Sequence, residues 1–156
     1  MFSRESQTQQ QTQHVGEVLA GCVRADDVIV LAGTLGAGKT QLVKGLARGL
    51  GVAEGITSPT FPILVEYEGV QLRLLHFDLY RLEHEDELDD VDFFGALESG
   101  CVSAIEWGDK FDDAMPDERL DVTFAIGQQG CRVLRFTGIG ARGGQLEREL
   151  EQALAE

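Results

Sequence analysis

Residues 33–40 read Gly33-Thr34-Leu35-Gly36-Ala37-Gly38-Lys39-Thr40 and match the phosphate-binding loop pattern G-x-x-x-x-G-K-[ST] at every fixed position. The residues before this loop, 28–32 (VIVLA), are typical of a buried strand, and residues 41–47 (QLVKGLA) are typical of a helix. Strand, glycine-rich loop and helix in this order are the context that the motif requires. The sequence therefore predicts a single-domain α/β protein of the P-loop NTPase type, in which helices flank a mixed β-sheet.

Each fixed position of the loop has a chemical role in binding a nucleotide. Glycines allow backbone N–H groups to approach phosphate closely. Lys39 supplies a positive charge for the β- and γ-phosphates, and the Thr40 hydroxyl is suited to ligate Mg²⁺. The following helix directs its positive N-terminal end at the anion. We expect the nucleotide to be bound by Leu35, Gly36, Ala37, Gly38, Lys39, Thr40 and Gln41.

Two features of the composition limit which ligands we expect the protein to bind. The chain contains no asparagine, which excludes the Asn-Lys-x-Asp loop that reads guanine, so we expect ATP and its product ADP. The 27 acidic residues outnumber the 13 Lys and Arg residues, for a net charge of −14. Because nucleic acid backbones are bound through clustered Lys and Arg, we do not expect strong direct binding of nucleic acid.

The remaining composition indicates an ordinary globular domain of 156 residues. No apolar run approaches the roughly 18–20 residues that span a bilayer, and the first residues lack a signal-peptide pattern, so we expect a cytoplasmic protein. Cys22, Cys101 and Cys131 form no C-x-x-C pair and indicate neither a zinc site nor a disulfide framework. Residues 1–11 are rich in Gln, Thr and Ser and are predicted to be disordered, which leaves 12–156 as the P-loop ATPase domain.

Periodicity and turn residues predict the other elements. A first helix is expected over 12–24 with Thr12 as its N-cap. The helix after the loop should end near Gly49 or Gly51. Further along we expect a hairpin of strands 63–67 and 71–78, an acidic helical stretch over 82–97, a strand over 102–107, a hairpin of 120–126 and 131–136, and a helix over 145–155.

Two acids follow hydrophobic strands downstream of the loop. Asp78 follows 72–77 and Glu106 follows 102–105. A P-loop site needs a second anchor for Mg²⁺, usually an acid at a strand end, and either residue is suited to bind the metal or to orient the attacking water. The alternative for each is an acid that accepts a hydrogen bond from a neighbouring backbone N–H. Spacing alone does not divide the roles.

Three further features have more than one interpretation. Thr60 lies in a loop after the motif, where P-loop switches place a threonine that senses the γ-phosphate. Trp107 is either a core residue or a stacking contact near the base. The acidic stretch 83–90 is either a solvated helix face or a docking surface for a basic partner.

The main rival to an ATPase is a small P-loop kinase that phosphorylates a small molecule. Arg73 and Arg81 are the only arginines in the middle of the chain, and no Arg-rich lid segment is apparent. The chain is also short for two substrate sites. We therefore prefer an ATPase whose turnover is slow alone and is raised by a partner, because no internal arginine finger can be identified.

Four segments taken together resemble the TsaE (YjeE) family. They are the loop 33–40, then 58–61 (SPTF), 76–82 (HFDLYRL) and 105–109 (IEWGD). The resemblance spans about residues 12–138. It implies an ATP- and Mg²⁺-dependent ATPase of bacterial tRNA threonylcarbamoyladenosine biosynthesis, which acts with TsaD-like and TsaB-like proteins and meets tRNA only through that complex.

The resemblance also implies roles for individual residues. It assigns Lys39, Asp78 and Glu106 to catalysis, and Thr40, Asp78 and Glu106 to the metal. It places Thr60 in the switch-like loop, and Thr12, Trp107 and Arg132 close to the nucleotide. One departure is Thr34, where the family usually has Asp or Glu; we expect ATP to bind nevertheless, because the glycines and Lys39 are present.

Overall fold

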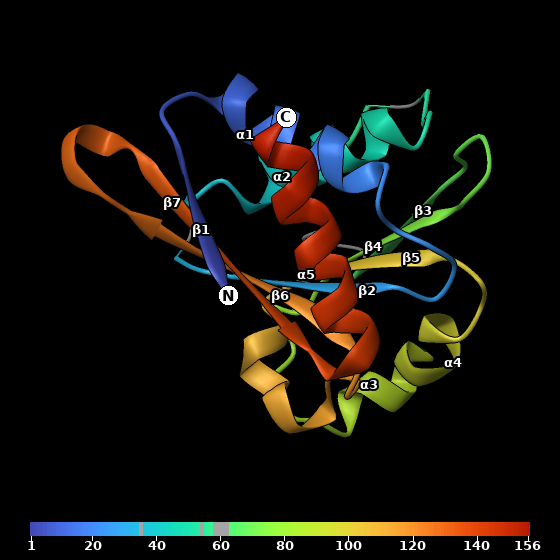
Figure 1. The fold of residues 1–156 in the computed structure, drawn as a ribbon. Helices are drawn as coiled ribbons and strands as arrows, with labels where there is room; N and C mark the ends of the chain where they lie inside the picture. The colour runs from blue at the N-terminus through green and yellow to red at the C-terminus, as the bar shows by residue number, and fades with distance from the viewer. Residues whose placement is uncertain (35, 54, 58–62) are drawn as a thin grey trace.

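A seven-stranded mixed sheet organises the fold (Figure 1). The computed structural model describes residues 1–34, 36–53, 55–57 and 63–156. Within these residues the strand order is β1-β7-β6-β2-β5-β4-β3. The strands are β1 (Phe2–Ser6), β2 (Val28–Ala32), β3 (Leu64–Tyr67), β4 (Leu74–Asp78), β5 (Val102–Glu106), β6 (Arg119–Ile126) and β7 (Arg132–Ile139).

The four central strands are parallel, and the outer strands are antiparallel. β2 pairs in parallel with β5 on one side and β6 on the other, and β4 pairs in parallel with β5. β7 and β1 extend the sheet in antiparallel pairs beyond β6, and β3 pairs antiparallel with β4. The fold confirms the mixed α/β sheet predicted from the sequence.

Helices cover both faces of this sheet (Figure 1). The helices are α1 (Gln9–Ala20), α2 (Lys39–Gly49), α3 (Glu87–Asp90), α4 (Phe93–Leu97) and α5 (Gly140–Ala155), with 3₁₀ turns η1 (Gly108–Ala114) and η2 (Gln128–Gly130). One apolar core forms where α1, α2 and α5 pack on one face, and a second forms where α3, α4 and η1 pack on the other. Burial on both faces explains why β2 is apolar at every position.

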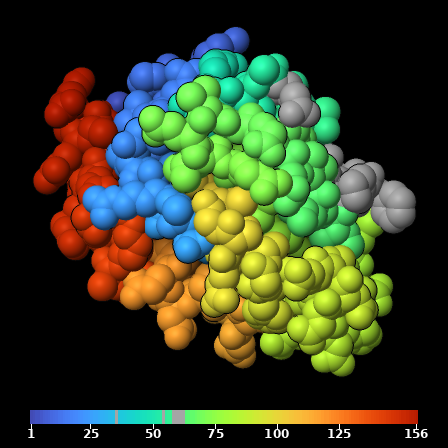
Figure 2. Space-filling model, turned by 90° about the vertical axis from the view of Figure 1, so that its right-hand side faces the viewer, coloured from blue at the N-terminus to red at the C-terminus, as the bar shows by residue number. Residues whose placement is uncertain are grey.

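At the N-terminal ends of the parallel strands, the loops that precede β2, β4 and β5 lie side by side (Figure 2). The Asp26 N–H donates to the Cys101 carbonyl at 2.9 Å, and the Val102 N–H donates to the Arg73 carbonyl at 2.9 Å. These contacts fix the strand starts relative to one another. No described helix is long and apolar enough to cross a membrane.

The first eleven residues are ordered, contrary to the prediction. Phe2–Ser6 forms the edge strand β1, which pairs with β7, and the Phe2 ring stacks on Phe136 at 4.7 Å between centroids. α1 begins at Gln9, and its N-cap is Thr8, whose hydroxyl accepts from the Gln11 N–H at 3.0 Å. Thr12 lies inside this helix, so the predicted cap was four residues too late.

Other elements also differ from the prediction. α5 begins at Gly140, five residues early, because its glycines pack against strand backbone; a Cβ on Gly143 would lie 2.1 Å from the Arg119 carbonyl oxygen. The acidic stretch 82–97 forms two short helices, and Asp92 between them has a φ of 52°. The predicted end of the helix after the loop is confirmed, since α2 ends at Gly49.

Glycines allow α1 and α2 to pack in close contact. A Cβ on Gly16 of α1 would lie 2.2 Å from the Leu42 carbonyl oxygen, and a Cβ on Gly45 of α2 would lie 1.8 Å from the Gln13 carbonyl oxygen. Any larger side chain at these positions forces the helices apart. This contact matters beyond the core, because the two helix starts approach the same cleft, which is described below.

Gly45→Ala tests the helix contact. We expect overpacking to lower the free energy of unfolding by about 1–3 kcal/mol, measured by equilibrium urea denaturation. The matched control is Gly55→Ala, where an added Cβ meets no atom of the described residues within 4 Å; it should stay within about 0.5 kcal/mol of the unsubstituted chain. Equal stability of the two variants would contradict the close α1–α2 contact.

Candidate functional site

The carboxyl ends of three parallel strands meet at a cleft of about 640 Å³. β2 continues into the phosphate loop, β4 ends at Asp78 and β5 ends at Glu106. The strand register pairs Glu106 with Leu31 on one side and with Asp78 on the other. Ligands in open α/β sheets bind outside this edge, so the fold brings the loop and both predicted acids to the expected place.

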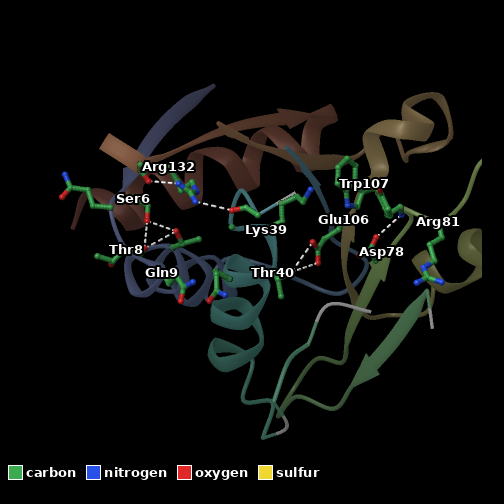
Figure 3. Close-up of a pocket in the computed structure, with 17 residues that line it drawn as sticks. Ser6, Thr8, Gln9, Lys39, Thr40, Asp78, Arg81, Glu106, Trp107 and Arg132 are labelled. Atoms are coloured by element: carbon green, nitrogen blue, oxygen red, sulfur yellow. Dashed lines mark hydrogen bonds between the residues drawn. The ribbon is translucent and has the colours of Figure 1, made fainter. Parts of the chain in front are cut away.

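Most of the predicted site residues line this cleft (Figure 3). Ala37 is the exception within the described chain, because its side chain is buried in the core behind the loop. Leu35 and Thr60, with the rest of 58–61, lie outside the described residues. The cleft residues that were predicted are Thr12, Gly36, Gly38, Lys39, Thr40, Gln41, Asp78, Glu106, Trp107 and Arg132.

The loop has the backbone conformation that its glycines permit. Gly36 has a φ of 78° and Gly38 a φ of 108°, both in the left-handed region that side chains rarely adopt. Gly38 directly precedes α2, so the helix begins at Lys39. The positive end of α2 therefore lies at the cleft, where it favours an anion.

The Lys39 ammonium group is held by neutral partners. Its Nζ donates to the Gly33 carbonyl at 2.6 Å and lies 3.7 Å from the centroid of the Trp107 ring. Burial lowers the pKa of Lys39, and the nearby carboxylates of Glu106, Asp109 and Asp78 partly oppose this shift. A buried cation with neutral contacts gains from an anionic ligand, which fits a phosphate-binding role.

Trp107 lies beside Lys39 rather than in the core alone. Its backbone has a φ of 65°, an unusual conformation for a bulky residue, and its N–H donates to the Leu31 carbonyl at 3.2 Å. The Tyr80 ring packs against it with centroids 5.1 Å apart. Figure 3 shows Trp107 at the same end of the cleft as Asp78, away from the N-terminal residues.

Glu106 is the centre of a buried hydrogen-bond network. Its two carboxylate oxygens lie 3.3 and 3.2 Å from the Thr40 hydroxyl, which donates to them. One of these oxygens also lies 2.5 Å from Nε2 of His76. Glu106 is only 3% exposed. The contact with Thr40 joins β5 to the residue that was predicted to ligate Mg²⁺.

Asp78 behaves differently from Glu106. It is 4% exposed, and its Oδ1 accepts from the Tyr80 N–H at 3.0 Å, the backbone contact that the sequence left open as an alternative. It nevertheless lines the cleft, so the contact does not exclude a role in catalysis. The described residues contain no group of three or more His, Cys, Asp and Glu side chains placed to hold a metal ion. Mg²⁺ needs few protein ligands, because it retains waters and takes phosphate oxygens.

The other end of the cleft is built from the N-terminus and the β6–β7 hairpin. The hydroxyls of Thr12 and Ser6 are 2.7 Å apart. Arg132 donates to the Gly130 carbonyl at 2.6 Å and to the Gly36 carbonyl at 3.3 Å, so it bridges the hairpin to the loop. The lining residues that sequence reasoning missed are Ser6, Gln7, Thr8, Gln9, Tyr80, Arg81 and Gly130.

The other polar features that the sequence singled out lie outside the centre of the site. Arg73 is exposed and pairs with Glu66 at 2.9 Å on the β3–β4 hairpin. In the acidic stretch, Glu87 accepts from the backbone N–H groups of Glu83 and His84, and these hydrogen bonds lower the pKa of its carboxyl group. Leu88 of the same stretch is fully buried. This is the pattern of an exposed helix that packs its apolar side against the sheet.

Comparison with known proteins gives one consistent family. The family model "Threonylcarbamoyl adenosine biosynthesis protein TsaE" matches residues 6–134. The chain is 35% identical over 143 residues to the tRNA threonylcarbamoyladenosine biosynthesis protein TsaE of Bacillus subtilis, which covers 92% of this chain and 89% of that protein. It is 40% identical over 137 residues to the protein of the same name from Streptomyces coelicolor, with coverage of 83% and 92%.

A solved structure agrees with this comparison. The crystal structure of Bacillus subtilis YdiB superposes with a TM-score of 0.80 at 32% sequence identity, and the match covers 97% of this chain and 94% of that one. The likeness therefore extends over nearly the whole fold. The chain belongs to the TsaE family of threonylcarbamoyl adenosine biosynthesis proteins.

Proposed function

We propose that this protein binds ATP with Mg²⁺ and hydrolyses it to drive or reset a TsaB–TsaD complex that makes threonylcarbamoyladenosine in tRNA. One observation carries the ATPase part of the proposal. The cleft places the P-loop Lys39, the first turn of α2 and the Thr40–Glu106 pair at one sheet edge. The family supports the pathway, and tRNA modification supports a cytoplasmic location.

The residues present fit a nucleoside triphosphate with Mg²⁺. The buried Lys39 ammonium has a carbonyl and a ring as contacts and is available to exchange them for phosphate oxygens. A hydroxyl and a carboxylate, the ligand chemistry that hard cations prefer, are joined at Thr40 and Glu106. Bound Mg²⁺ would supply neutralisation of charge on the phosphates.

The side chains at the cleft have separate roles in the proposed hydrolysis. Lys39 and the α2 N-terminus bind and orient the phosphates, and Glu106 orients the attacking water or accepts its proton. Asp78 accepts a hydrogen bond from the Tyr80 N–H, which holds the turn after β4, and its side chain lines the cleft. At the far end, Thr12, Ser6 and Arg132 form the wall next to which we place the base.

Two observations support a role for partner proteins in hydrolysis and in contact with tRNA. The described part of the cleft has Arg81 and Arg132 on its walls, and Arg132 is engaged with the Gly36 carbonyl. Strong charge stabilisation in P-loop enzymes often comes from an arginine that a partner inserts. The net charge of −14 favours contact with tRNA through a TsaD-like or TsaB-like protein rather than directly.

Trp107 provides a direct test of nucleotide binding. It is the chain's single tryptophan, and Lys39 lies against its ring, so drawing Lys39 onto phosphate should change its emission. We expect a saturable change on titration with Mg²⁺–ADP. Lys39→Ala should alter emission of the free protein and weaken ADP binding by about 10-fold or more. Calorimetric binding without any change in emission would show that the Lys39–Trp107 contact persists.

Turnover tests the proposed function itself. ATP hydrolysis should be slow for the protein alone and should rise when TsaB-like and TsaD-like proteins and tRNA are added, as measured by phosphate release. Lys39→Ala should reduce the stimulated rate by about 100-fold or more. A rate that ignores these partners, but rises with a small-molecule acceptor that becomes phosphorylated, would indicate a kinase instead.

Paired substitutions of the two acids test the division of roles. Glu106→Gln keeps the size of the side chain and removes its charge, and should lower kcat by about 10²–10⁴-fold while ADP still binds. Asp78→Asn retains an oxygen that can accept a hydrogen bond from the Tyr80 N–H, and it should lower kcat less than Glu106→Gln does. The reverse order of effects would assign the water-orienting role to Asp78.

A further inference from the structure

His76 is a buried polar residue beneath the site that sequence reasoning did not assign to any step. It lies on β4, two residues before Asp78, and is 0% exposed. Alternate residues of a strand point to the same face, and the register pairs His76 with Ala104 and Asp78 with Glu106. His76, Asp78 and Glu106 therefore share the sheet face on which α2 lies.

The contact between His76 and Glu106 indicates which ring nitrogen carries the hydrogen. Nε2 of His76 lies 2.5 Å from Oε2 of Glu106, and an ionised carboxylate only accepts hydrogen bonds. We therefore assign the donor hydrogen to Nε2, for Glu106 in its ionised form. The other ring nitrogen, Nδ1, is buried with no hydrogen-bond partner among the described residues. The ring thus directs its hydrogen bond to the acid of the site.

The two hydrogen-bond contacts of Glu106 come from different elements and differ in length. The Thr40 hydroxyl lies 3.2 and 3.3 Å away on α2, and in the proposed function it would be a ligand of Mg²⁺. His76 belongs to the neighbouring strand, and its contact is shorter. If Thr40 were to bind the metal instead, His76 would still contact the carboxylate.

We propose that His76 is a positioning residue: its Nε2–H fixes the Glu106 carboxylate in the orientation in which Glu106 serves ATP hydrolysis. This rests on the proposed function, which gives Glu106 that role. The competing explanation is that His76 only fills space beneath the sheet edge. The two explanations make different demands on the side chain that replaces His76. A positioning residue requires an N–H that can donate to Glu106, whereas a space-filling residue requires only a similar volume.

The first experiment compares two replacements in steady-state kinetics with the TsaB-like and TsaD-like proteins and tRNA. His76→Leu removes the donor, and His76→Gln retains an N–H in a position close to that of Nε2. We expect His76→Leu to lower kcat by about 10–100-fold, as loss of an orienting partner does, with KM for ATP changed by less than about 3-fold. His76→Gln should recover most of the loss.

Ser103→Ala is the matched control. Ser103 is also buried, on β5, and its hydroxyl has no partner among the described residues, but it lies on the opposite face of the sheet from Glu106. Removing its hydroxyl should leave kcat within about 2-fold of wild type, as expected for a group outside the network. Urea unfolding of all the variants shows whether a loss of rate follows a loss of folding.

A double substitution shows whether His76 acts through Glu106. In the Glu106→Gln background, His76→Leu should lower kcat by less than about 2-fold further, because two residues that act as a unit are not additive. A full additional loss, or a His76→Gln variant as slow as His76→Leu, would overturn the positioning role.

A second measurement needs no turnover. The ¹⁵N shifts of the His76 ring in the nucleotide-free protein should show hydrogen on Nε2, and the Nε2–H signal should move in Glu106→Gln. Hydrogen on Nδ1 alone would overturn the proposal for His76 and leave the ATPase intact. A wild-type protein that does not hydrolyse ATP with its partners would overturn the proposed function, and the role of His76 with it, whatever the ring shifts show.

Discussion

The parallel register of β2, β5 and β4 is the constraint on which the site depends. Glu106 is paired with Leu31 of β2 and with Asp78 of β4, so the three strands end together. The phosphate loop leaves the end of β2, and the two acids complete the ends of the other strands. The strand pairing therefore brings to one sheet edge groups that lie far apart in the sequence.

This arrangement lowers the stability of the folded state. Lys39, Asp78, Glu106 and His76 are all buried at one sheet edge, and burying polar and charged groups is unfavourable unless each finds a partner. Each has at least one hydrogen-bond contact in the structure, with Lys39 on a carbonyl and Glu106 on Thr40 and His76. The apolar cores on the two faces of the sheet supply the stability that offsets this cost.

The parts of the fold that the sequence predicted were those with local signals. The loop 33–40, the buried strand before it and the end of α2 at Gly49 each follow from a few neighbouring residues. β1 was not predictable in this way, because Phe2–Ser6 becomes a strand only by pairing with β7 at the other end of the chain. α5 was placed too late because its early glycines, poor helix formers, are required for close packing against Arg119.

The same reasoning applies to the site. Two strand-end acids could be identified from hydrophobic runs, but their different contacts could not, since Thr40 and His76 reach Glu106 from other elements. His76 begins the segment 76–82 that carries the family resemblance, but sequence reasoning assigned it no chemical role, although its position two residues before Asp78 placed it on the same strand face. Lining residues from β1 and its turn were missed for the same reason that β1 was missed.

The contacts of Lys39 link the structure to its proposed activity. The ammonium group lies on the Trp107 ring and the Gly33 carbonyl, and Trp107 itself has a left-handed backbone conformation held by its bond to β2. In the proposed function a phosphate would have to displace these contacts of Lys39, and their loss would offset part of the favourable ion-pair energy. Trp107 directly follows Glu106 in the chain, so the ring that contacts Lys39 and the carboxylate that contacts Thr40 lie on one short stretch of backbone. In the proposed function, the residue beside the phosphate-binding Lys39 and the acid that orients the attacking water are therefore neighbours in the chain.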